Sequence, residues 1–299
     1  MIFAFSPSGM DNSESLLDYI RANCDNVSIG VRTENRQDRS LFREKYRGDS
    51  RINVFIKKNR PLLAYWFLLT SQYVFFSDGS ILHVANKRPG QIVINLWHGC
   101  GYKDIQNPAN KWINGTMFDY VLVPGKVFVE TKAAFFSCER RQVLPIGYPR
   151  YDILRKQYPQ VEQELNKHRF KKMGVWMPTY RKVDSGEAPE SNIQTDFDLP
   201  LLNSEEELIQ LNRFCQQRQI LLYIKKHPAQ VPYTSEGLNL SNIVFLSYND
   251  LRRRGIQNCE LLASADALIS DYSSAAIDYL LLDRPVAFAL ADFEAYRDT

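Results

Sequence analysis

Short runs of apolar, β-branched and aromatic residues recur along the chain, separated by segments with a helical spacing of apolar and polar positions. Runs in the first half predict strands at MIFAFS (1–6), VSIGV (27–31), INVFI (52–56), YVFFS (73–77), IVINLW (92–97), YVLVPG (120–125) and QVLPIG (142–147). The pattern restarts with MGVWMP (173–178), LLYIKK (221–226), IVFLS (243–247), DALIS (266–270) and PVAFAL (285–290). This alternation is typical of βα units in a mostly parallel sheet.

The pattern divides the chain into two doubly wound halves. The charged stretch from Arg155 to Lys172 predicts one amphipathic helix and a connector, so we place the domains at residues 1–155 and 156–299. In the second half, a helix is expected from Ser204 to Gln217, with Ser204 and Glu207 forming a capping box. Ligands of such sheets bind beyond the carboxyl ends of the strands, so the residues after each run are the candidates for chemistry.

Composition supports an ordinary globular protein. A chain of 299 residues, 44% of them hydrophobic, can bury the cores of about two domains. Five scattered cysteines without a CxxC pair predict neither a disulfide framework nor a thiolate zinc site, and they fit a reducing cytoplasm. The N-terminus reads as a first strand and not as a signal peptide.

Two local features bear on membranes. Pro61–Ser77 carries no charge but reaches only the lower edge of the length that a membrane span needs, so we expect a buried helix running into a strand. The net charge of +3 is small, but between Arg32 and Arg60 ten Lys or Arg stand against four Asp or Glu. This basic region is either a solvated face or a patch that rests on anionic lipid. Nucleic acid ranks below both, because no recognition motif accompanies the charge.

His98 is the most informative single residue. It follows the strand at residues 92–97, where apolar residues give way to glycines, and open α/β sheets place their chemistry at such strand ends. Alone, a histidine beside Trp97 is more often a hydrogen-bonded structural residue. It therefore needs support from elsewhere in the chain.

Polar residues at the strand ends of the second half suit a phosphate. Lys225, Lys226 and His227 end one strand, and lysine and histidine bind phosphate well. Another strand ends at Ser270 in DYSS, and a helix beginning near Ser273 or Ser274 would offer unpaired N–H groups to a diphosphate.

Each of these features has a structural alternative. Lysine pairs at strand ends are common, serines cap helices, and an acidic residue such as Asp278 near a helix start complements the dipole. Thr179 and Arg181 follow a further strand, where Arg181 can grip a phosphate. Arg150 and Asp152 close the first half, where a Gly-Pro turn is the alternative.

Taken together and in this order, the segments resemble the CDP-glycerol glycerophosphotransferase family, the teichoic-acid primases and polymerases. The matching positions are Trp97, His98, Gly99 and Lys103 in WHG-x-x-x-K; Gly147, Pro149, Arg150 and Asp152 in G-x-PR-x-D; Pro178, Thr179 and Arg181 in PT-x-R; Lys225, His227 and Pro228 in K-x-HP; and Ser270 to Ser274, Asp278, Arg284 and Pro285 in the last segment.

The resemblance implies a GT-B fold, with two Rossmann-like domains facing a central cleft. The N-terminal domain would receive the acceptor at Trp97, Gly99, Lys103, Arg150 and Asp152, with His98 as general base. The C-terminal domain would bind the donor phosphates and nucleotide at His227, Arg181, Thr179, Lys225, Asp271, Ser273, Ser274 and Asp278. His227 would contact the donor phosphates and count with His98 among the catalytic residues.

The chain departs from the family pattern in places. Cys100, Gly101 and Tyr102 replace the usual Thr-Pro-Leu, and Tyr151 replaces the usual Asn, which leaves the acceptor open. Relatives continue beyond the position of Thr299, so we expect the second domain to be incomplete.

The expected activity is transfer of glycerol phosphate, or a related polyol phosphate, from a CDP-activated donor to a hydroxyl of a lipid-linked or polymeric glycan. CMP is released, in the synthesis of teichoic acid or capsule polymer for the cell wall. A histidine has the right intrinsic pKa for the base, and cations can stabilise the leaving CMP, so no cofactor is required and a divalent metal is not indicated. We expect a cytoplasmic enzyme, peripheral at the inner face of the membrane. Two alternatives stay open: a GT-B transferase of another nucleotide-linked unit, and a catalytically weak binding domain of a larger assembly.

Overall fold

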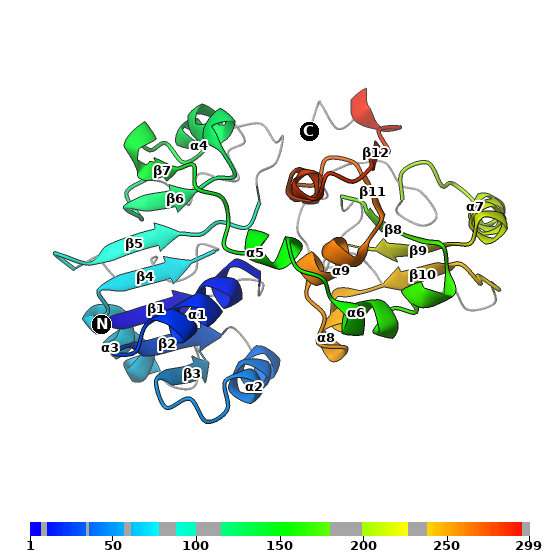
Figure 1. The fold of residues 1–299 in the computed structure, drawn as a ribbon. Coiled ribbons are helices and arrows are strands. Elements are labelled where there is room, and N and C mark those ends of the chain that lie inside the picture. The colour runs from blue at the N-terminus through cyan, green and yellow to red at the C-terminus, as the bar shows by residue number, and fades with distance from the viewer. Residues whose placement is uncertain are drawn as a thin grey trace. The chain divides into compact units, whose positions relative to one another are not determined.

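The computed structural model describes residues 1–6, 11–33, 36–56, 61–77, 88–99, 115–179, 199–226 and 238–294. These residues form two compact units, one ending at Arg150 and the other beginning at Tyr151 (Figure 1). Contacts between residues divide the chain after Arg150, five residues before the domain boundary expected after residue 155. That domain boundary stays a prediction.

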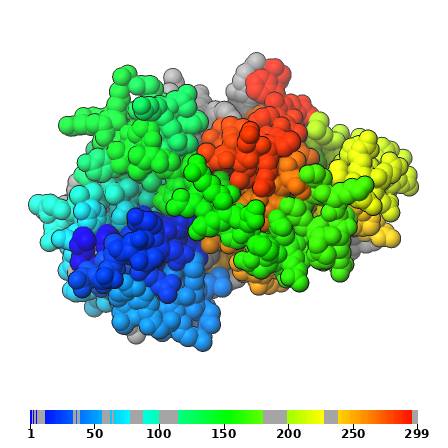
Figure 2. Space-filling model, viewed as in Figure 1, coloured from blue at the N-terminus to red at the C-terminus, as the bar shows by residue number. Residues whose placement is uncertain are grey.

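The first unit is built on a parallel sheet in the order β3-β2-β1-β4-β5-β6-β7. Its strands are β1 (Ile2–Ser6), β2 (Ser28–Thr33), β3 (Ile52–Ile56), β4 (Tyr73–Phe76), β5 (Ile92–Asn95), β6 (Tyr120–Leu122) and β7 (Val143–Leu144). Its helices are α1 (Asp11–Asn23), α2 (Arg36–Lys45), α3 (Pro61–Thr70), α4 (Val129–Phe135) and the 3₁₀ turns η2 (Lys126–Phe128) and η3 (Arg140–Gln142). Helices α1 and α2 form much of the near surface of this unit (Figure 2). The strand order reverses between β1 and β4, which is where a doubly wound sheet binds its ligands.

The second unit repeats this plan with a parallel sheet in the order β10-β9-β8-β11-β12. Its strands are β8 (Lys172–Met177), β9 (Ile220–Lys225), β10 (Ile243–Leu246), β11 (Ala267–Ser270) and β12 (Val286–Phe288). Its helices are α5 (Tyr151–Leu154), α6 (Pro159–Glu164), α7 (Glu205–Arg218), α8 (Tyr248–Arg253), α9 (Asn258–Ser264), α10 (Ala275–Tyr279) and the 3₁₀ turns η4 (Lys167–Arg169) and η5 (Leu280–Leu282). Here the order reverses between β8 and β11.

Every strand expected from the apolar runs is present. Each sheet buries valines or leucines from its central strands, among them Val74 and Val93 in the first unit and Val175 and Leu268 in the second. Strands buried on both faces are continuous apolar runs in the sequence, and this is why the pattern predicted them well.

Two helix predictions need correction. The single helix expected from Arg155 is instead α6, which begins only at Pro159, because a proline is favoured in the first turn of a helix and cannot lie in its interior. At α7, the Ser204 hydroxyl accepts from the N–H of Glu207 as expected. The return bond of the capping box goes elsewhere, because the Glu207 carboxylate accepts from the N–H of Asn203 at 2.6 Å.

The expectation of a buried helix after Pro61 is half wrong. Helix α3 does run into strand β4, and Phe67 and Leu68 are buried. However, Leu62 is 84% exposed, Trp66 51% and Leu69 48%. A helix that is apolar all round can bury only one face against a single sheet, and the opposite face stays in contact with solvent.

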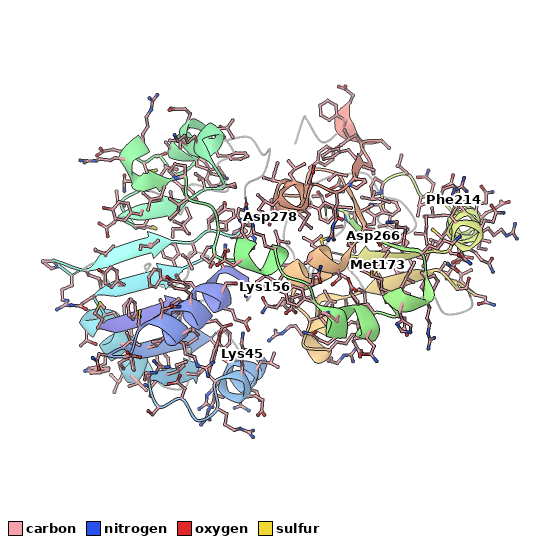
Figure 3. All side chains as sticks on the ribbon, in the orientation of Figure 1. Lys45, Lys156, Met173, Phe214, Asp266 and Asp278 are labelled. Carbon is pink, nitrogen blue, oxygen red and sulfur yellow. The ribbon has the colours of Figure 1, made fainter. Side chains whose placement is uncertain are left out.

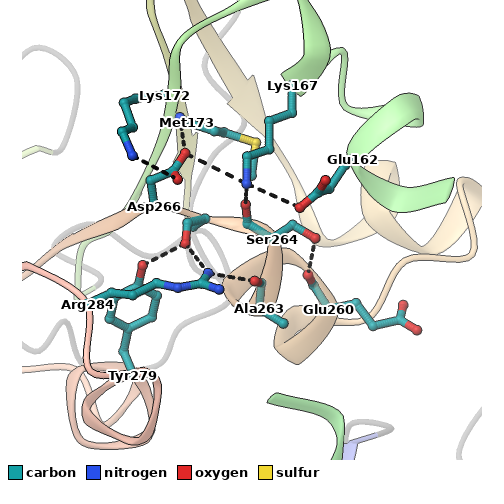
Figure 4. Close-up of polar contacts among 11 residues, drawn as sticks. Glu162, Lys167, Lys172, Met173, Glu260, Ala263, Ser264, Asp266, Tyr279 and Arg284 are labelled. Atoms are coloured by element: carbon teal, nitrogen blue, oxygen red, sulfur yellow. Dashed lines mark hydrogen bonds and ion pairs between the residues drawn. The ribbon is translucent and has the colours of Figure 1, made fainter. Parts of the chain in front are cut away.

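A polar network joins the end of α9 to α10 and to Arg284, which precedes β12, in the second unit (Figure 4). The Arg284 guanidinium donates to the carbonyls of Ala263 at 2.7 Å and Ala265 at 2.5 Å. The Tyr279 hydroxyl donates to Ala265 at 2.9 Å, and burial raises the pKa of Tyr279 to about 12, so this donor keeps its proton near neutral pH. These bonds satisfy carbonyls at the end of α9 that the helix itself leaves unpaired.

Candidate functional site

His98 lies where the sequence placed it, just beyond the carboxyl end of β5. Its ring is exposed, and Nδ1 lies 3.0 Å from the carbonyl oxygen of Ser77, which follows β4. A carbonyl can only accept, so in the neutral ring Nδ1 carries the hydrogen and Nε2 carries the lone pair. This tautomer presents Nε2 as a proton acceptor.

Trp97 supports the histidine ring. The two ring centroids are 4.1 Å apart, and Trp97 also makes an edge contact with Phe136 at 5.0 Å. The Lys132 ammonium lies 5.6 Å from the centre of the Trp97 ring, within range of a cation–π attraction. Gly99 follows and is buried. Thus the WHG segment packs as a unit at the edge of the sheet.

Buried polar residues that the sequence interpretation missed hold this segment. Asn12, in the first turn of α1, donates from Nδ2 to the Trp97 carbonyl at 2.7 Å. The next residue, Ser13, shares a hydrogen bond of 3.2 Å with the Ser77 hydroxyl. In the sequence both residues look like ordinary polar residues of a helix start, and no local signal marks their contacts with residues far along the chain.

In the second unit, three predicted residues lie at the carboxyl ends of adjacent strands. Thr179 follows β8, Lys225 ends β9 and Asp271 follows β11, and all three are buried. Asp271 accepts from the Thr179 N–H at 2.8 Å and from the Thr179 hydroxyl at 2.5 Å. These bonds join β8 and β11 at the point where the strand order reverses.

Other predicted donor residues surround the start of α10. Ser274 is the N-cap of α10, and its side chain makes no capping bond, whereas the Ser273 hydroxyl accepts from the N–H of Ala275 at 3.3 Å. Asp278, labelled in Figure 3, is buried and accepts from the Tyr151 hydroxyl at 3.0 Å. Tyr151, expected on the acceptor side, therefore contacts a residue of the predicted donor set.

The remaining predicted residues differ in what the structure says of them. Arg150 is buried, its guanidinium lies 4.5 Å from the centre of the Tyr148 ring, and its N–H donates to Asn12. Asp152 is exposed on α5. The predictions for Lys103, Arg181 and His227 lie outside the described residues. Within the described ranges, no group of three or more His, Cys, Asp or Glu side chains is arranged to hold a metal ion.

Comparison with known proteins decides the family. Residues 3–299 match the family model of the CDP-glycerol:poly(glycerophosphate) glycerophosphotransferases. The chain belongs to this family. The resemblance read from the motifs is confirmed.

Relatives in this family are teichoic acid enzymes. The chain is 26% identical over 286 residues to the teichoic acid ribitol-phosphate polymerase TarK of Staphylococcus aureus, covering 87% of this chain and 52% of the relative. It is 26% identical over 250 residues to the teichoic acid glycerol-phosphate primase of Bacillus subtilis, covering 77% of this chain and 59% of the relative. This family member thus spans about half the length of the curated relatives it matches.

Solved structures confirm the fold class. The wall teichoic acid polymerase TagF superposes with a TM-score of 0.69 at 21% identity, over 99% of this chain and 72% of that one. A UDP-GlcNAc 2-epimerase from Neisseria meningitidis gives a TM-score of 0.55 at 10% identity, over 95% of this chain and 80% of that one. At these identities the likeness concerns the fold alone, which is the expected GT-B type.

Proposed function

We propose that this family member transfers a polyol phosphate from a CDP-activated donor to a hydroxyl of a lipid-linked or polymeric teichoic acid acceptor. The family match over residues 3–299 carries this proposal. Relatives include glycerol-phosphate and ribitol-phosphate enzymes, so the proposed donors are CDP-glycerol and CDP-ribitol.

His98 is the proposed general base. Nε2 accepts the proton of the acceptor hydroxyl, whose oxygen bonds to the phosphorus that carries the polyol. The bond between that phosphorus and the bridging oxygen breaks, and CMP leaves with the electron pair. The contact between Nδ1 and Ser77 supports this role, because it holds the ring in the tautomer that a base requires.

Residues of the second unit are proposed to bind the donor. CMP gains negative charge as it leaves, and cations near its phosphate stabilise that charge. Lys225 ends β9 beside Thr179 and Asp271, where a doubly wound sheet binds its ligand. His227 and Arg181 complete the set by the family motifs. Asp271 has a different proposed role from these residues. Its carboxylate already accepts hydrogen bonds from Thr179, so it positions Thr179 and does not itself contact the donor.

The activity is tested with purified protein, CDP-glycerol or CDP-ribitol, and a short poly(glycerol phosphate) or poly(ribitol phosphate) acceptor. The readout is CMP release measured by chromatography. His98→Ala should lower kcat by about 10²–10⁴-fold, whereas His168→Ala, an exposed histidine on η4, is the matched control and should leave it unchanged.

Three results would overturn parts of this proposal. No CMP from either donor contradicts the reaction. Stabilisation by a UDP-sugar, and by neither CDP-polyol, favours a transferase of another unit. Full activity of His98→Ala contradicts the base.

We also propose that the transfer requires no cofactor, because lysine and arginine side chains can supply the positive charge that a metal would otherwise bring. Activity measured in excess EDTA should equal that in added Mg²⁺. A strict Mg²⁺ requirement contradicts the proposal.

We further propose that the protein binds peripherally to the anionic inner face of the cell membrane. No helix of the described ranges has the length and apolar character needed to cross a bilayer. Helix α3 instead exposes Leu62, Tyr65, Trp66 and Leu69, which repeat at the spacing of one helical face. Such a face, with a tryptophan and a tyrosine, suits the boundary between headgroups and acyl chains.

Positively charged side chains lie near this apolar face, and they favour an anionic membrane surface as its partner. Arginines 36, 39, 43 and 47 line a groove of about 980 Å³, and Leu63 of α3 lines it too. Glu44, which pairs with Arg47, and Asp49 also line it, so the arginines are in excess by two. Leu63 follows Leu62 and points about 100° further round α3, so the groove lies along the flank of the apolar face. Anionic headgroups match this charge, and each arginine near such a surface contributes about 1 kcal/mol.

Vesicle co-sedimentation tests the surface. The protein should bind vesicles that contain phosphatidylglycerol and not those of phosphatidylcholine alone, and Leu62→Glu with Leu69→Glu should abolish binding. Val127→Glu with Ile146→Glu, two exposed apolar residues elsewhere on the same unit, is the control. Sedimentation velocity measures the oligomeric state of the same variants. If the α3 variant converts a dimer to a monomer without changing vesicle binding, the face binds a second copy and the membrane proposal fails.

A further inference from the structure

The residue just before His98 has an unusual backbone. Trp97 has a φ of +51°, in the left-handed region that side chains other than glycine rarely adopt. Such a residue is stable only when its surroundings hold it, and it is a common feature of functional sites. The peptide that follows Trp97 carries the nitrogen of His98, so the Trp97 conformation sets the direction in which the histidine leaves the strand.

Two buried asparagines hold the backbone of Trp97 from both ends. The Asn95 side-chain oxygen accepts from the Trp97 N–H at 2.8 Å, and the Asn12 side-chain nitrogen donates to the Trp97 carbonyl at 2.7 Å. The same Asn12 nitrogen lies 3.4 Å from the Leu96 carbonyl. Asn95 is 0% exposed and Asn12 is 4% exposed, so water does not compete for these bonds.

We propose that Asn12 and Asn95, the asparagine clamp, are positioning residues for His98. A peptide group is planar, so fixing its carbonyl fixes the whole plane up to the next Cα. The clamp fixes the peptide planes on both sides of Trp97, and the Ser77 carbonyl fixes the far end of the histidine through Nδ1. With both ends held, Nε2 keeps one direction and one tautomer.

Asn12 also connects the clamp to the second motif of the first unit. Its side-chain oxygen accepts from the Arg150 N–H at 3.3 Å, so one side chain binds the WHG segment through its nitrogen and the PR segment through its oxygen. Both segments are assigned to the acceptor side, and Asn12 keeps them in register with each other.

The two positions need opposite hydrogen-bonding groups, and this gives a sharp test. Asn12 must donate to a carbonyl, so Asn12→Asp puts a carboxylate against carbonyl oxygens and breaks the clamp. Asn95 must accept, so Asn95→Asp keeps the bond to Trp97 even if the buried charge lowers stability, whereas Asn95→Leu removes it. Asn23→Ala, an exposed asparagine on the same helix α1, is the control.

Nuclear magnetic resonance of ¹⁵N-labelled histidine measures the tautomer of the His98 ring, which the clamp is proposed to fix. The chain has four histidines, and His98→Gln assigns the signal of His98. The unaltered protein, Asn95→Asp and Asn23→Ala should show the Nδ1–H tautomer, while Asn12→Ala, Asn12→Asp and Asn95→Leu should shift toward the Nε2–H form that water favours. An unchanged His98 signal in folded Asn12→Asp and Asn95→Leu overturns the proposal.

Kinetics provide a second readout, which rests on the proposed transferase activity. Loss of the clamp should lower kcat about 10²-fold, the usual effect of misplacing a reacting group by about 1 Å, with the KM for the CDP-activated donor within about twofold. A lowered melting temperature with unchanged kcat means that the asparagines only stabilise the fold. If the unaltered protein transfers nothing, the proposed function fails, and the resonance experiment still decides the clamp.

Discussion

Asp271→Asn is the substitution whose cost the structure defines best. The Asp271 side chain is 1% exposed, and its carboxylate accepts from three donors: the Thr179 N–H at 2.8 Å, the Thr179 hydroxyl at 2.5 Å and the Tyr272 N–H at 2.7 Å. It is the link between the ends of β8 and β11. Asparagine keeps the shape of this side chain but replaces one acceptor oxygen with a donor.

The cost follows from the bonds that the amide cannot make. All three bonds go to one oxygen, Oδ1, while Oδ2 accepts a longer bond from the Thr179 N–H at 3.0 Å. With its oxygen at the Oδ1 position, asparagine keeps the three bonds in weaker, uncharged form. It loses the bond to Oδ2 and places its NH₂ group against the Thr179 N–H. A hydrogen bond to a charged group contributes about 1.5–3 kcal/mol, and a buried donor left unpaired costs a similar amount. The expected loss in the free energy of unfolding is therefore about 2–4 kcal/mol, confined to the second unit.

The measurement must report on the second unit alone. Trp176, in β8, is the only tryptophan between residues 151 and 299, so its fluorine signal in 5-fluorotryptophan-labelled protein follows that unit through a urea titration. Asp283→Asn is the matched control. Asp283 is exposed and has a φ of +51°, a conformation that asparagine adopts readily, so its substitution should stay within about 0.5 kcal/mol.

A loss below about 0.5 kcal/mol for Asp271→Asn would refute the reasoning. It would mean that the carboxylate is not the link between the two strands and has room to bind another partner, such as the donor. A loss of the expected size, with unfolding of the first unit unchanged, supports the structural role.

Three further predictions concern other parts of the chain. Gly30→Ala should cost the first unit about 1–3 kcal/mol in thermal unfolding, because a Cβ there would lie 2.6 Å from the Phe67 ring, whereas Gly125→Ala meets nothing within 4 Å and should be neutral. The Arg51 side chain holds the pKa of Asp49 well below its usual value, so this pair stabilises the fold above the unfolded value of about 3.9 and less as the pH falls through the folded value. Arg51→Met should lower the melting temperature at pH 7, and the gap to the unaltered protein should narrow below about pH 4; a gap independent of pH contradicts the ion pair. Burial raises the pKa of Cys215 to about 11, so in a thiol-labelling experiment read by mass spectrometry the partly exposed Cys24 should react before Cys215, and labelling of Cys215 as early as Cys24 contradicts its burial.

The strands were predictable because their signal is local. Each apolar run is a few residues long, lies in the interior of a parallel sheet, and needs no knowledge of its neighbours. Helix α3 was harder, because Leu62 and Phe67 look alike in the sequence and differ only in what lies opposite them. The late start of α6 was available from Pro159 and was missed.

The candidate site was predictable where residue type carries the chemistry. His98, Lys225 and Thr179 were found because they lie at or just after the ends of strands, and the topology places the strand ends of each sheet together. Asn12 and Asn95 could not be found this way. Their bonds go to backbone atoms, and the Asn12 contact spans 85 positions in the sequence, so no spacing rule reveals it.

The two units place buried polar side chains in similar positions. Strand ends leave N–H and C=O groups that must find partners when they are buried, and loops at the point of strand reversal expose several such groups at once. In the first unit Asn12 and the Ser13–Ser77 pair bind the loops after β4 and β5; in the second unit Asp271 binds the segment after β8. The side chains proposed to meet substrate, His98 and Thr179, are each held by residues that do not need to touch it. Loss of activity on substitution therefore does not by itself identify a contact with substrate. Substitution of a residue that only holds the site should change the His98 tautomer or make its unit unfold earlier. Substitution of a residue that acts on substrate should lower activity without either change.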